Sequence, residues 1–307
     1  MTVYLSEYIY PPAVEKLKQH ATVVDNFDHI EDIDAIILRN IPVTAEMMDR
    51  AKRLKVIAKH GIGCNTIDVA AARDRGIQVI YTPTANADSV AEMTVGLFLA
   101  LERRIVEANA KCRHSEFATI APRDFLGTEI QGKTFGQIGM GNIAQRIAHI
   151  MSAGFGVKVL GYDPFVPAEE AEKRGFEKVG TLEELMERSD MVNINVPLVK
   201  STVNMISGDL FNHFKPGAVF VNAARGAVIN EDDLYDALVS GKLKAAACDT
   251  FIQEPPTAEN RLLSLPNFSA TPHIGGNTEE ALQKAGTEVV EETLNVLAGK
   301  APLHPVH

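Results

Sequence analysis

Residues 135–145 read FGQIGMGNIAQ, a glycine run that follows a short apolar stretch and precedes an amphipathic one. A strand that turns into a helix at such glycines presents backbone N–H groups to a pyrophosphate with no Cβ in the way. We expect Gly139 to form the turn and Gly141 to allow the close approach. The third position of the motif is Ala144, where the helix should pack on the strand and one methyl group is tolerated.

An acidic residue downstream supports this interpretation. Asp163 ends the next apolar stretch, VLGYDP, and lies 19 residues after Ala144, close to the spacing of about 20 in dinucleotide-binding sequences. A carboxylate there can accept hydrogen bonds from both hydroxyls of an adenosine ribose, whereas a 2′-phosphate would meet like charge. The sequence therefore predicts NAD, and not NADP, as the cofactor.

The glycine run begins near the middle of the 307-residue chain, so the residues before it need their own explanation. They alternate β-branched stretches such as DAIIL with helical patterns, which is typical of a parallel sheet covered by helices. A second series of this kind follows the run, and a long helix is predicted from about Asn277. We predict an α/β fold of two domains: a Rossmann NAD-binding domain (100–285) inserted into a flavodoxin-like substrate domain (1–99 and 286–307).

Composition disfavours several classes of function. A formal net charge of −10 argues against nucleic acid as a partner. The first residues lack the basic start and apolar run of a signal peptide, and no apolar stretch is long enough to span a bilayer, so we expect a cytoplasmic protein without a membrane partner. Metal-binding motifs such as CxxC and HExxH are absent, so no metal is predicted. Cys64 fits a small half-buried residue better than a reactive thiol.

Three segments, each after a predicted strand, carry side chains suited to hydride transfer on a 2-hydroxy or 2-keto acid. They hold Arg225, then Asp249 and Glu254, and then His273. Arginine is a natural partner for a carboxylate, and histidine titrates near neutral pH, where it can exchange a proton with the substrate oxygen. Structural alternatives stay open at this stage, because a strand-end arginine is often a surface ion-pair residue and a single histidine is often structural.

Several longer stretches stand in an order that is more specific than any one of them. They are KHGIGCNTIDVAAARDRGIQVIYTPTANADSVAE, GTEIQGKTFGQIGMGNIAQ, VLGYDP, VNAARGAVINEDDLYDAL, CDTFIQEPP and TPHIGGNTEEA. In this order the chain resembles the D-isomer-specific 2-hydroxyacid dehydrogenase family over nearly its whole length. Its motifs are most similar to the 3-phosphoglycerate dehydrogenase branch, in a short form without a regulatory domain.

The resemblance implies a catalytic set of Arg225, Glu254 and His273. His273 would donate a proton when a ketone is reduced and accept one when an alcohol is oxidised. Glu254 would orient the imidazole ring and favour its protonated form. Arg225 would bind the substrate carboxylate and polarise the carbonyl group.

The resemblance also implies a cofactor surface, a substrate loop and a homodimer formed through the cofactor domain. Asp249 is assigned to the carboxamide of the nicotinamide. The cofactor residues are Gly139, Gly141, Asn142, Ile143, Asp163, Val196, Pro197, Thr202, Ala223, Ala224, Arg225, Asp249, His273 and Gly275. The substrate residues are Lys59, Gly61, Ile62, Gly63, Arg225 and His273.

The identity of the substrate stays open. Lys59 would suit a phosphate, with His60 as a second donor, which makes 3-phosphoglycerate or 3-phosphohydroxypyruvate one candidate among small 2-hydroxy acids. The chain has Asn65 and Thr66 where the family usually has Asp and Asn, and this difference beside the substrate loop weakens any transfer of specificity. A non-catalytic NADH-sensing protein of the same fold is the alternative function.

Overall fold

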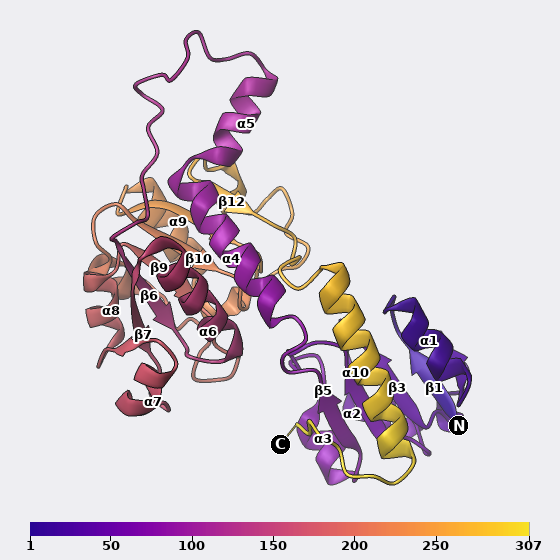
Figure 1. The fold of residues 1–307 in the computed structure, drawn as a ribbon. Helices are drawn as coiled ribbons and strands as arrows, with labels where there is room; N and C mark the ends of the chain where they lie inside the picture. The colour runs from indigo at the N-terminus through magenta and orange to yellow at the C-terminus, as the bar shows by residue number, and fades with distance from the viewer. Residues whose placement is uncertain (307) are drawn as a thin grey trace. The chain divides into compact units, whose positions relative to one another are not determined.

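The computed structural model describes residues 1–306 and divides into two compact units (Figure 1). The discontinuous unit comprises Met1–Asn86 and Asn277–His307, and the continuous unit comprises Ala87–Gly276. The expected domain boundaries at 99 and 286 are therefore shifted. Each observed boundary lies just ahead of a long helix, so that α4 (Ala87–Glu102) belongs wholly to the continuous unit and α10 (Glu279–Leu297) wholly to the discontinuous one.

The discontinuous unit is built on a five-stranded parallel sheet. Its strands pair in the order β2-β1-β3-β4-β5, which is the flavodoxin-like order. The central strands β3 and β4 are buried along their whole length, and this explains why they read as uninterrupted apolar stretches. The strands are β1 (Thr2–Leu5), β2 (Thr22–Val24), β3 (Ala35–Leu38), β4 (Val56–Lys59) and β5 (Gln78–Tyr81).

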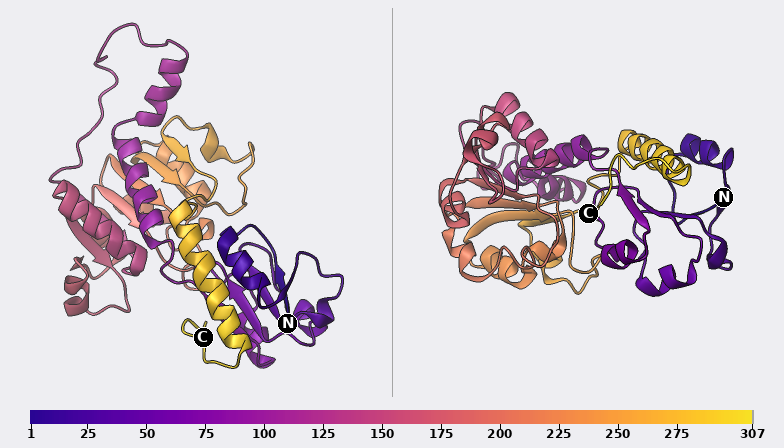
Figure 2. Two further views of the ribbon diagram at one scale, coloured as in Figure 1. Left: turned by 45° about the vertical axis from the view of Figure 1, so that its right-hand side comes forward. Right: turned by 90° about the horizontal axis from the view of Figure 1, so that it is seen from below.

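Helices cover both faces of this sheet (Figure 2). On one face α1 (Pro11–Lys18) and α10 enclose a core that includes Leu17 and Val289, and on the other α2 (Ala45–Arg50) and α3 (Val69–Asp74) pack over a second core. α10 returns to this sheet, as the sequence allows, and contacts three of its strands. A short 3₁₀ segment, η1 (Ile30–Asp32), precedes β3.

The C-terminal segment adds a contact that the sequence does not predict. The N–H of Val306 donates to the carbonyl of Val79 at 2.9 Å, beside an antiparallel bridge between Pro305 and Ile80. His304 faces two carboxylates of α10, with its Nδ1 3.1 Å from Glu288 Oε1 and 3.3 Å from Glu292 Oε2. These contacts hold the tail along the open edge of β5.

The continuous unit is built on a seven-stranded parallel sheet in the order β12-β11-β10-β9-β6-β7-β8. Its first strand, β6, lies inside the sheet with β7 on one side and β9 on the other, so the strand order reverses there, as in the Rossmann fold. The strands are β6 (Thr134–Ile138), β7 (Lys158–Tyr162), β8 (Glu177–Lys178), β9 (Met191–Ile194), β10 (Ala218–Asn222), β11 (Leu243–Cys248) and β12 (Phe268–Ala270).

Two apolar cores flank this second sheet. One face is covered by α4 and α6 (Asn142–His149). α6 continues as a π-helical turn over Ile150–Gly154. The other face is covered by α8 (Leu182–Arg188) and α9 (Glu231–Val239). The remaining short elements are α7 (Ala168–Lys173), η3 (Gly208–His213), η4 (Gly226–Val228) and η5 (Arg261–Ser264).

The chain between α4 and β6 contains a helix that the sequence analysis did not predict. α4 ends at Glu102, Arg104 has a positive φ of 52°, and a separate helix, α5 (Ile105–Arg113), begins there. None of the α5 residues is buried, and α5 with the segment after it extends away from the sheet of its unit (Figure 1). We call residues 105–127 the arm.

The two ends of the arm are joined at its base. The N–H of Thr128 donates to the carbonyl of Glu102 at 2.8 Å. The buried carboxylate of Glu102 accepts from Lys244 Nζ at 2.6 Å and from Lys133 Nζ at 3.3 Å. Because a buried charge is costly unless it is paired, these two lysines stabilise the point at which the arm leaves the sheet.

In residues 1–306, none of the helices combines the length and the apolar character that a membrane crossing requires.

Candidate functional site

The continuous unit gathers its predicted site residues at one edge of the sheet. Because all seven strands are parallel, the loops that follow them emerge at the same edge. Gly139 and Gly141 follow β6, Asp163 follows β7, and Val196 and Pro197 lie just after β9. The remaining strand-end residues are Ala223, Ala224 and Arg225 after β10, Asp249 after β11, and His273 and Gly275 after β12.

The glycine run forms the expected turn from β6 into α6. Gly139 has a positive φ of 84°, and a Cβ there would lie 2.4 Å from the carbonyl oxygen of Asn195, so the position requires glycine. Gly141 is the N-cap of α6, no side chain caps the helix, and a Cβ on Gly141 would meet nothing within 4 Å. Ala144 is fully buried in the core, which confirms its expected packing role.

Asp163 links the glycine turn to β7. One carboxylate oxygen accepts from the N–H of Met140 at 3.1 Å and the other from the N–H of Phe165 at 3.0 Å. The side chain is nevertheless only half-buried. A dinucleotide fits this frame, because the open space at Gly141 and the uncapped N–H groups of Asn142 and Ile143 suit a pyrophosphate, while Asp163 stands at the strand end where a ribose would lie.

A buried asparagine shapes the turn that carries Arg225. Asn222, the last residue of β10, donates from Nδ2 to the carbonyl of Arg225 at 2.9 Å and accepts from the N–H of Ala224 at 3.0 Å. The following Gly226 passes directly beneath another loop, since a Cβ there would lie 1.9 Å from the carbonyl carbon of Phe251. The turn is therefore fixed on both sides of the half-buried Arg225.

His273 and Glu254 form a hydrogen-bonded pair. The ring Nδ1 lies 2.9 Å from Glu254 Oε2, and both side chains keep about two-fifths of their surface exposed, at 41% and 37%. Partial burial works to raise the pKa of the Glu254 carboxyl, but the hydrogen bond and charge of His273, the N–H of Phe251 and the charge of Arg225 together hold that pKa below its ordinary value. Glu254 is therefore a carboxylate at neutral pH, and its bond to the histidine uses the Nδ1 atom of the ring.

The structure shows how Asp249 holds the segment that carries His273. Its buried carboxylate accepts from the hydroxyl of Thr271 at 2.5 Å and from the N–H groups of Ile274 and Gly275 at 2.9 and 2.8 Å. The carbonyl of Asp249 also accepts from the N–H of His273 at 2.7 Å. These bonds hold His273 at a positive φ of 57°, a conformation that costs of order 1–3 kcal/mol for a residue other than glycine.

The loop after β9 is organised by its own polar side chains. The hydroxyl of Thr202 donates to the carbonyl of Pro197 at 2.6 Å and accepts from the N–H of Val199 at 2.9 Å, which closes the turn. The side-chain oxygen of Asn195 accepts from the buried amides of Gln137 and Asn193. This network joins β6 to β9 beneath the glycine turn.

The predicted substrate loop lies at the corresponding edge of the discontinuous unit. Lys59 ends β4 and is buried, and Gly61 follows with a φ of 122° and donates its N–H to the hydroxyl of Thr82 at 2.8 Å. Burial, followed by the charges of Arg39 and Lys59, lowers the pKa of His60 to about 4. His60 is therefore neutral at pH 7, and positive charge at this edge comes from Lys59 and Arg39.

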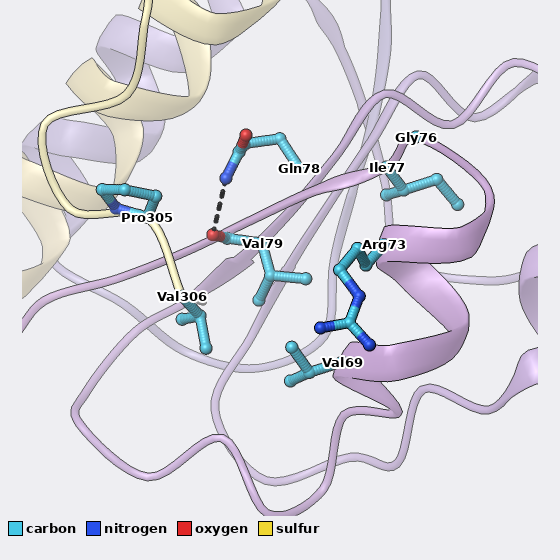
Figure 3. Close-up of a pocket in the computed structure, with 8 residues that line it drawn as sticks. All are labelled: Val69, Arg73, Gly76, Ile77, Gln78, Val79, Pro305 and Val306. Carbon is cyan, nitrogen blue, oxygen red and sulfur yellow. Dashed lines mark hydrogen bonds between the residues drawn. The ribbon is translucent and has the colours of Figure 1, made fainter.

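Neither of two surface cavities contains the catalytic set. One, of about 290 Å³, lies by the amino end of β5, where apolar side chains and Arg73 surround it (Figure 3). Lys59 is at the opposite, carboxyl end of the neighbouring strand. The other, of about 480 Å³, is bounded by the start of α9 and the loop that carries Glu254, and its lining includes Glu231, Ile252 and Asn260.

One group of side chains in the described residues has the composition of a metal site. Ligand atoms of Glu288, Glu292 and His304 lie within 4.8 Å of one another in the discontinuous unit. The contacts of His304 Nδ1 with both carboxylates, together with the 2.7 Å hydrogen bond from the N–H of His304 to Glu292, already account for the arrangement. We interpret the group as the clamp that holds the C-terminal segment.

The reversed strand order, the glycine turn and the polar residues at the strand ends define a dinucleotide-binding protein of the Rossmann type. A model described as "D-isomer specific 2-hydroxyacid dehydrogenase, NAD binding domain" matches residues 95–275, more than half of the chain. The chain belongs to the D-isomer specific 2-hydroxyacid dehydrogenase family.

Curated relatives differ in length from this chain. The D-3-phosphoglycerate dehydrogenase of Methanocaldococcus jannaschii is 42% identical over 274 residues, which cover 89% of this chain and 51% of that protein. The hydroxypyruvate reductase of Thermotoga maritima is 39% identical over 287 residues, which cover 92% and 91%. The chain thus spans about half the length of the first of these relatives.

Solved structures share the whole fold. The crystal structure of the TT0316 protein from Thermus thermophilus has a TM-score of 0.91 at 32% identity. An acyclic imino acid reductase in complex with NADPH and D-Arg has a TM-score of 0.89 at 27% identity. Both comparisons cover all of this chain and all of the other.

Sequence reasoning missed the residues that hold the catalytic side chains in place. Asn222 bonds both sides of the Arg225 turn, and Glu231 bonds the loop that carries Glu254. A polar residue at the end of an otherwise apolar strand was a usable signal for Asn222. Glu231 offered none, because an acidic residue in the first turn of a helix is common.

We expect the two glycines of the turn to respond differently to alanine. Gly139→Ala should lower the Tm by about 5 °C or more, because its Cβ meets Asn195 at a positive φ. Gly141→Ala should leave the Tm unchanged and weaken NADH binding by about tenfold or more, since its methyl group fills the space at the helix N-terminus. Calorimetry and nicotinamide fluorescence measure the two effects. An equal loss of Tm in both variants would contradict this assignment.

Proposed function

We propose that this chain is an NAD-dependent D-2-hydroxyacid dehydrogenase that interconverts a 2-hydroxy acid and its 2-keto acid. The observation that carries the proposal is the hydrogen-bonded pair of His273 and Glu254, with the charge of Arg225 acting on the same carboxylate. A proton donor and a carboxylate-binding cation beside a dinucleotide frame are what reduction of a 2-keto acid requires. Membership of the family and the names of the relatives support it.

In this mechanism His273 moves the proton. The nicotinamide, when bound, supplies or takes up a hydride at C4. In the direction of reduction, Nε2 of the imidazolium donates its proton to the carbonyl oxygen as C2 receives the hydride. The Nδ1–H bond to Glu254 fixes the tautomer and orients the ring. In the direction of oxidation, neutral His273 accepts the hydroxyl proton.

Arg225 binds the substrate in this mechanism. Its guanidinium forms two parallel hydrogen bonds with a carboxylate when the geometry allows. Binding of the substrate carboxylate holds C2 and the oxygen on C2 in a fixed orientation. The positive charge of Arg225 stabilises the negative charge that develops on this oxygen during reduction. Lysine would keep the charge and lose the fork, so Arg225 is not interchangeable with it.

The discontinuous unit supports a substrate with an additional anionic group. Lys59 and Arg39 supply charge at the carboxyl edge of its sheet, where the loop Gly61–Gly63 begins, and neutral His60 can contribute a hydrogen bond without charge. 3-Phosphohydroxypyruvate and hydroxypyruvate are therefore the first substrates to test. Ile62 also belongs to the proposed substrate loop, where we assign a contact to its backbone N–H and none to its side chain.

We assign NAD as the cofactor because Asp163 lies at the end of β7. A 2′-phosphate would approach this carboxylate and be repelled, although solved relatives include an imino acid reductase in complex with NADPH and a glyoxylate/hydroxypyruvate reductase in complex with NADP. We expect kcat/KM to be at least about tenfold higher with NADH than with NADPH. Initial rates measured with each coenzyme give the ratio. A lower KM for NADPH would contradict the assignment.

Replacement of His273 tests the chemistry. His273→Ala should lower kcat by about 10²- to 10⁴-fold while NADH still binds, because the variant loses the proton donor and retains the dinucleotide frame. Absorbance at 340 nm follows turnover with hydroxypyruvate, its 3-phosphate, pyruvate, a branched keto acid and a sulfonated analogue. His213→Ala is the matched control, since His213 also pairs with a glutamate, Glu187, at 2.8 Å.

Two outcomes would contradict this function. Near-normal kcat in His273→Ala would remove the histidine from the mechanism. No turnover of any keto acid by the unaltered protein, with NADH binding intact, would favour the alternative of a non-catalytic NADH-sensing protein.

We also propose that the chain forms a homodimer through the continuous unit. The arm exposes apolar side chains, with Ile105, Val106, Ile120 and Leu126 at 53%, 55%, 97% and 75% of their surface, and a second copy would cover them. We expect light scattering to give the mass of two chains, and replacement of residues 106–126 by a short glycine linker to give one. A monomer at micromolar concentration would contradict this.

The cytosolic location of the protein stays a prediction from the sequence.

A further inference from the structure

The loop that carries Glu254 is largely exposed and depends on one carboxylate from a neighbouring helix. Glu231, the first residue of α9, accepts from the N–H of Ile252 through Oε1 and from Asn260 Nδ2 through Oε2, both at 2.8 Å. Glu254 lies between these two attachment points. A single side chain therefore joins the beginning of the loop to its end.

The first attachment point is next to the residue that bonds Glu254. The N–H of Phe251 donates to Glu254 Oε1 at 3.1 Å, and the next N–H, that of Ile252, donates to Glu231. The backbone of Gly226 packs directly against this dipeptide, where a Cβ would lie 1.9 Å from Phe251 and 2.3 Å from Ile252. The position of the dipeptide thus affects both the Glu254 carboxylate and the turn of the preceding Arg225.

The start of α9 does not need Glu231 for its own stability. Asn230 caps the helix by accepting from the N–H groups of Asp232 and Asp233, and these two aspartates supply first-turn charge. An acidic residue in a first turn contributes about 0.3–1 kcal/mol through the helix dipole, so the helix has this contribution from its neighbours. The two bonds of Glu231 are directed at the loop.

We propose that Glu231 is a positioning residue for the acid–base histidine, acting through Ile252 and Phe251 on Glu254 and so on His273. This inference rests on the proposed function for its catalytic consequence. When Glu231 no longer ties the loop, Glu254 spends less time on His273 Nδ1. The ring then loses the hydrogen bond that fixes its orientation.

The donor and acceptor of the bond between Asn260 and Glu231 can be exchanged by two substitutions. In Glu231→Gln the side-chain oxygen can still accept one of the two hydrogen bonds. The new NH₂ group then faces the other donor, so the second hydrogen bond is lost. When Glu231→Gln is combined with Asn260→Asp, the amide at position 231 still accepts from Ile252 and now donates to the carboxylate at position 260. The second oxygen of that carboxylate can still accept from the N–H of Leu262, which lies 3.1 Å from Asn260 Oδ1 in the unaltered protein. The double variant restores the bonds to the loop without restoring charge to the helix.

The test measures two readouts on the full-length protein. With NADH and the best keto acid, we expect kcat to fall about 5- to 50-fold in Glu231→Gln, with the Kd for NADH within about twofold, and to recover to within about threefold of the original in the double variant. Glu231→Asp keeps the charge but shortens the reach, and it should lose activity as Glu231→Gln does. Asp233→Asn removes a first-turn charge whose carboxylate bonds the N–H of Gly208 and not this loop, and it should leave kcat unchanged.

The second readout needs no turnover. At one fixed pH, the NMR signal of ¹³C-labelled His273, assigned by its loss in His273→Ala, should move in Glu231→Gln and return in the double variant, because the ring is hydrogen-bonded to Glu254. An unmoved signal in Glu231→Gln, or a loss of activity that the double variant does not recover, would overturn the proposal. If the double variant does not fold, full activity and an unmoved signal in Glu231→Asp overturn it. A moved and restored signal without turnover in the unaltered protein would instead reject the proposed function alone.

Discussion

β6 pairs in parallel with β7 through one edge and with β9 through the other, and the organisation of the continuous unit depends on this arrangement. Parallel pairing brings every strand's carboxyl end to the same side, so loops separated by more than a hundred residues of sequence emerge together. The reversal of strand order at β6 separates the loops on its two sides and leaves the α6 N-terminus open. Glycine at 139 is needed because the turn passes against Asn195.

Polar side chains that bond the backbone then fix the loops at this edge. Asn222 and Asp249 end or follow buried strands and satisfy N–H and carbonyl groups that the loops would otherwise leave without partners. Removing one partner from such a buried bond costs about 1–3 kcal/mol, so each of these residues stabilises the loop that it bonds. Glu231 differs, because it holds an exposed loop whose own apolar contacts are few.

Much of this fold could be predicted from local patterns. The apolar stretches located the buried strands, and the glycine run with Ala144 located the β6–α6 turn. The prediction failed where the outcome depends on packing between distant segments. The separate helix α5, which begins after Arg104 and buries none of its residues, was not expected. The domain boundaries were misplaced because a long helix belongs to whichever core buries its apolar face, and periodicity alone does not identify that core.

For the site, the sequence by itself predicted the glycine turn and Asp163 from residue type and spacing, and its resemblance to the family predicted Arg225, Glu254 and His273 as the catalytic set. Only the tertiary structure decided how they are held. The 2.9 Å contact of His273 with Glu254 joins residues 19 apart in the chain, and the bonds of Glu231 to Ile252 and Asn260 span 21 and 29. Such contacts leave no periodic signal, because they depend on where the strands end in space and not on the spacing of residues along the chain.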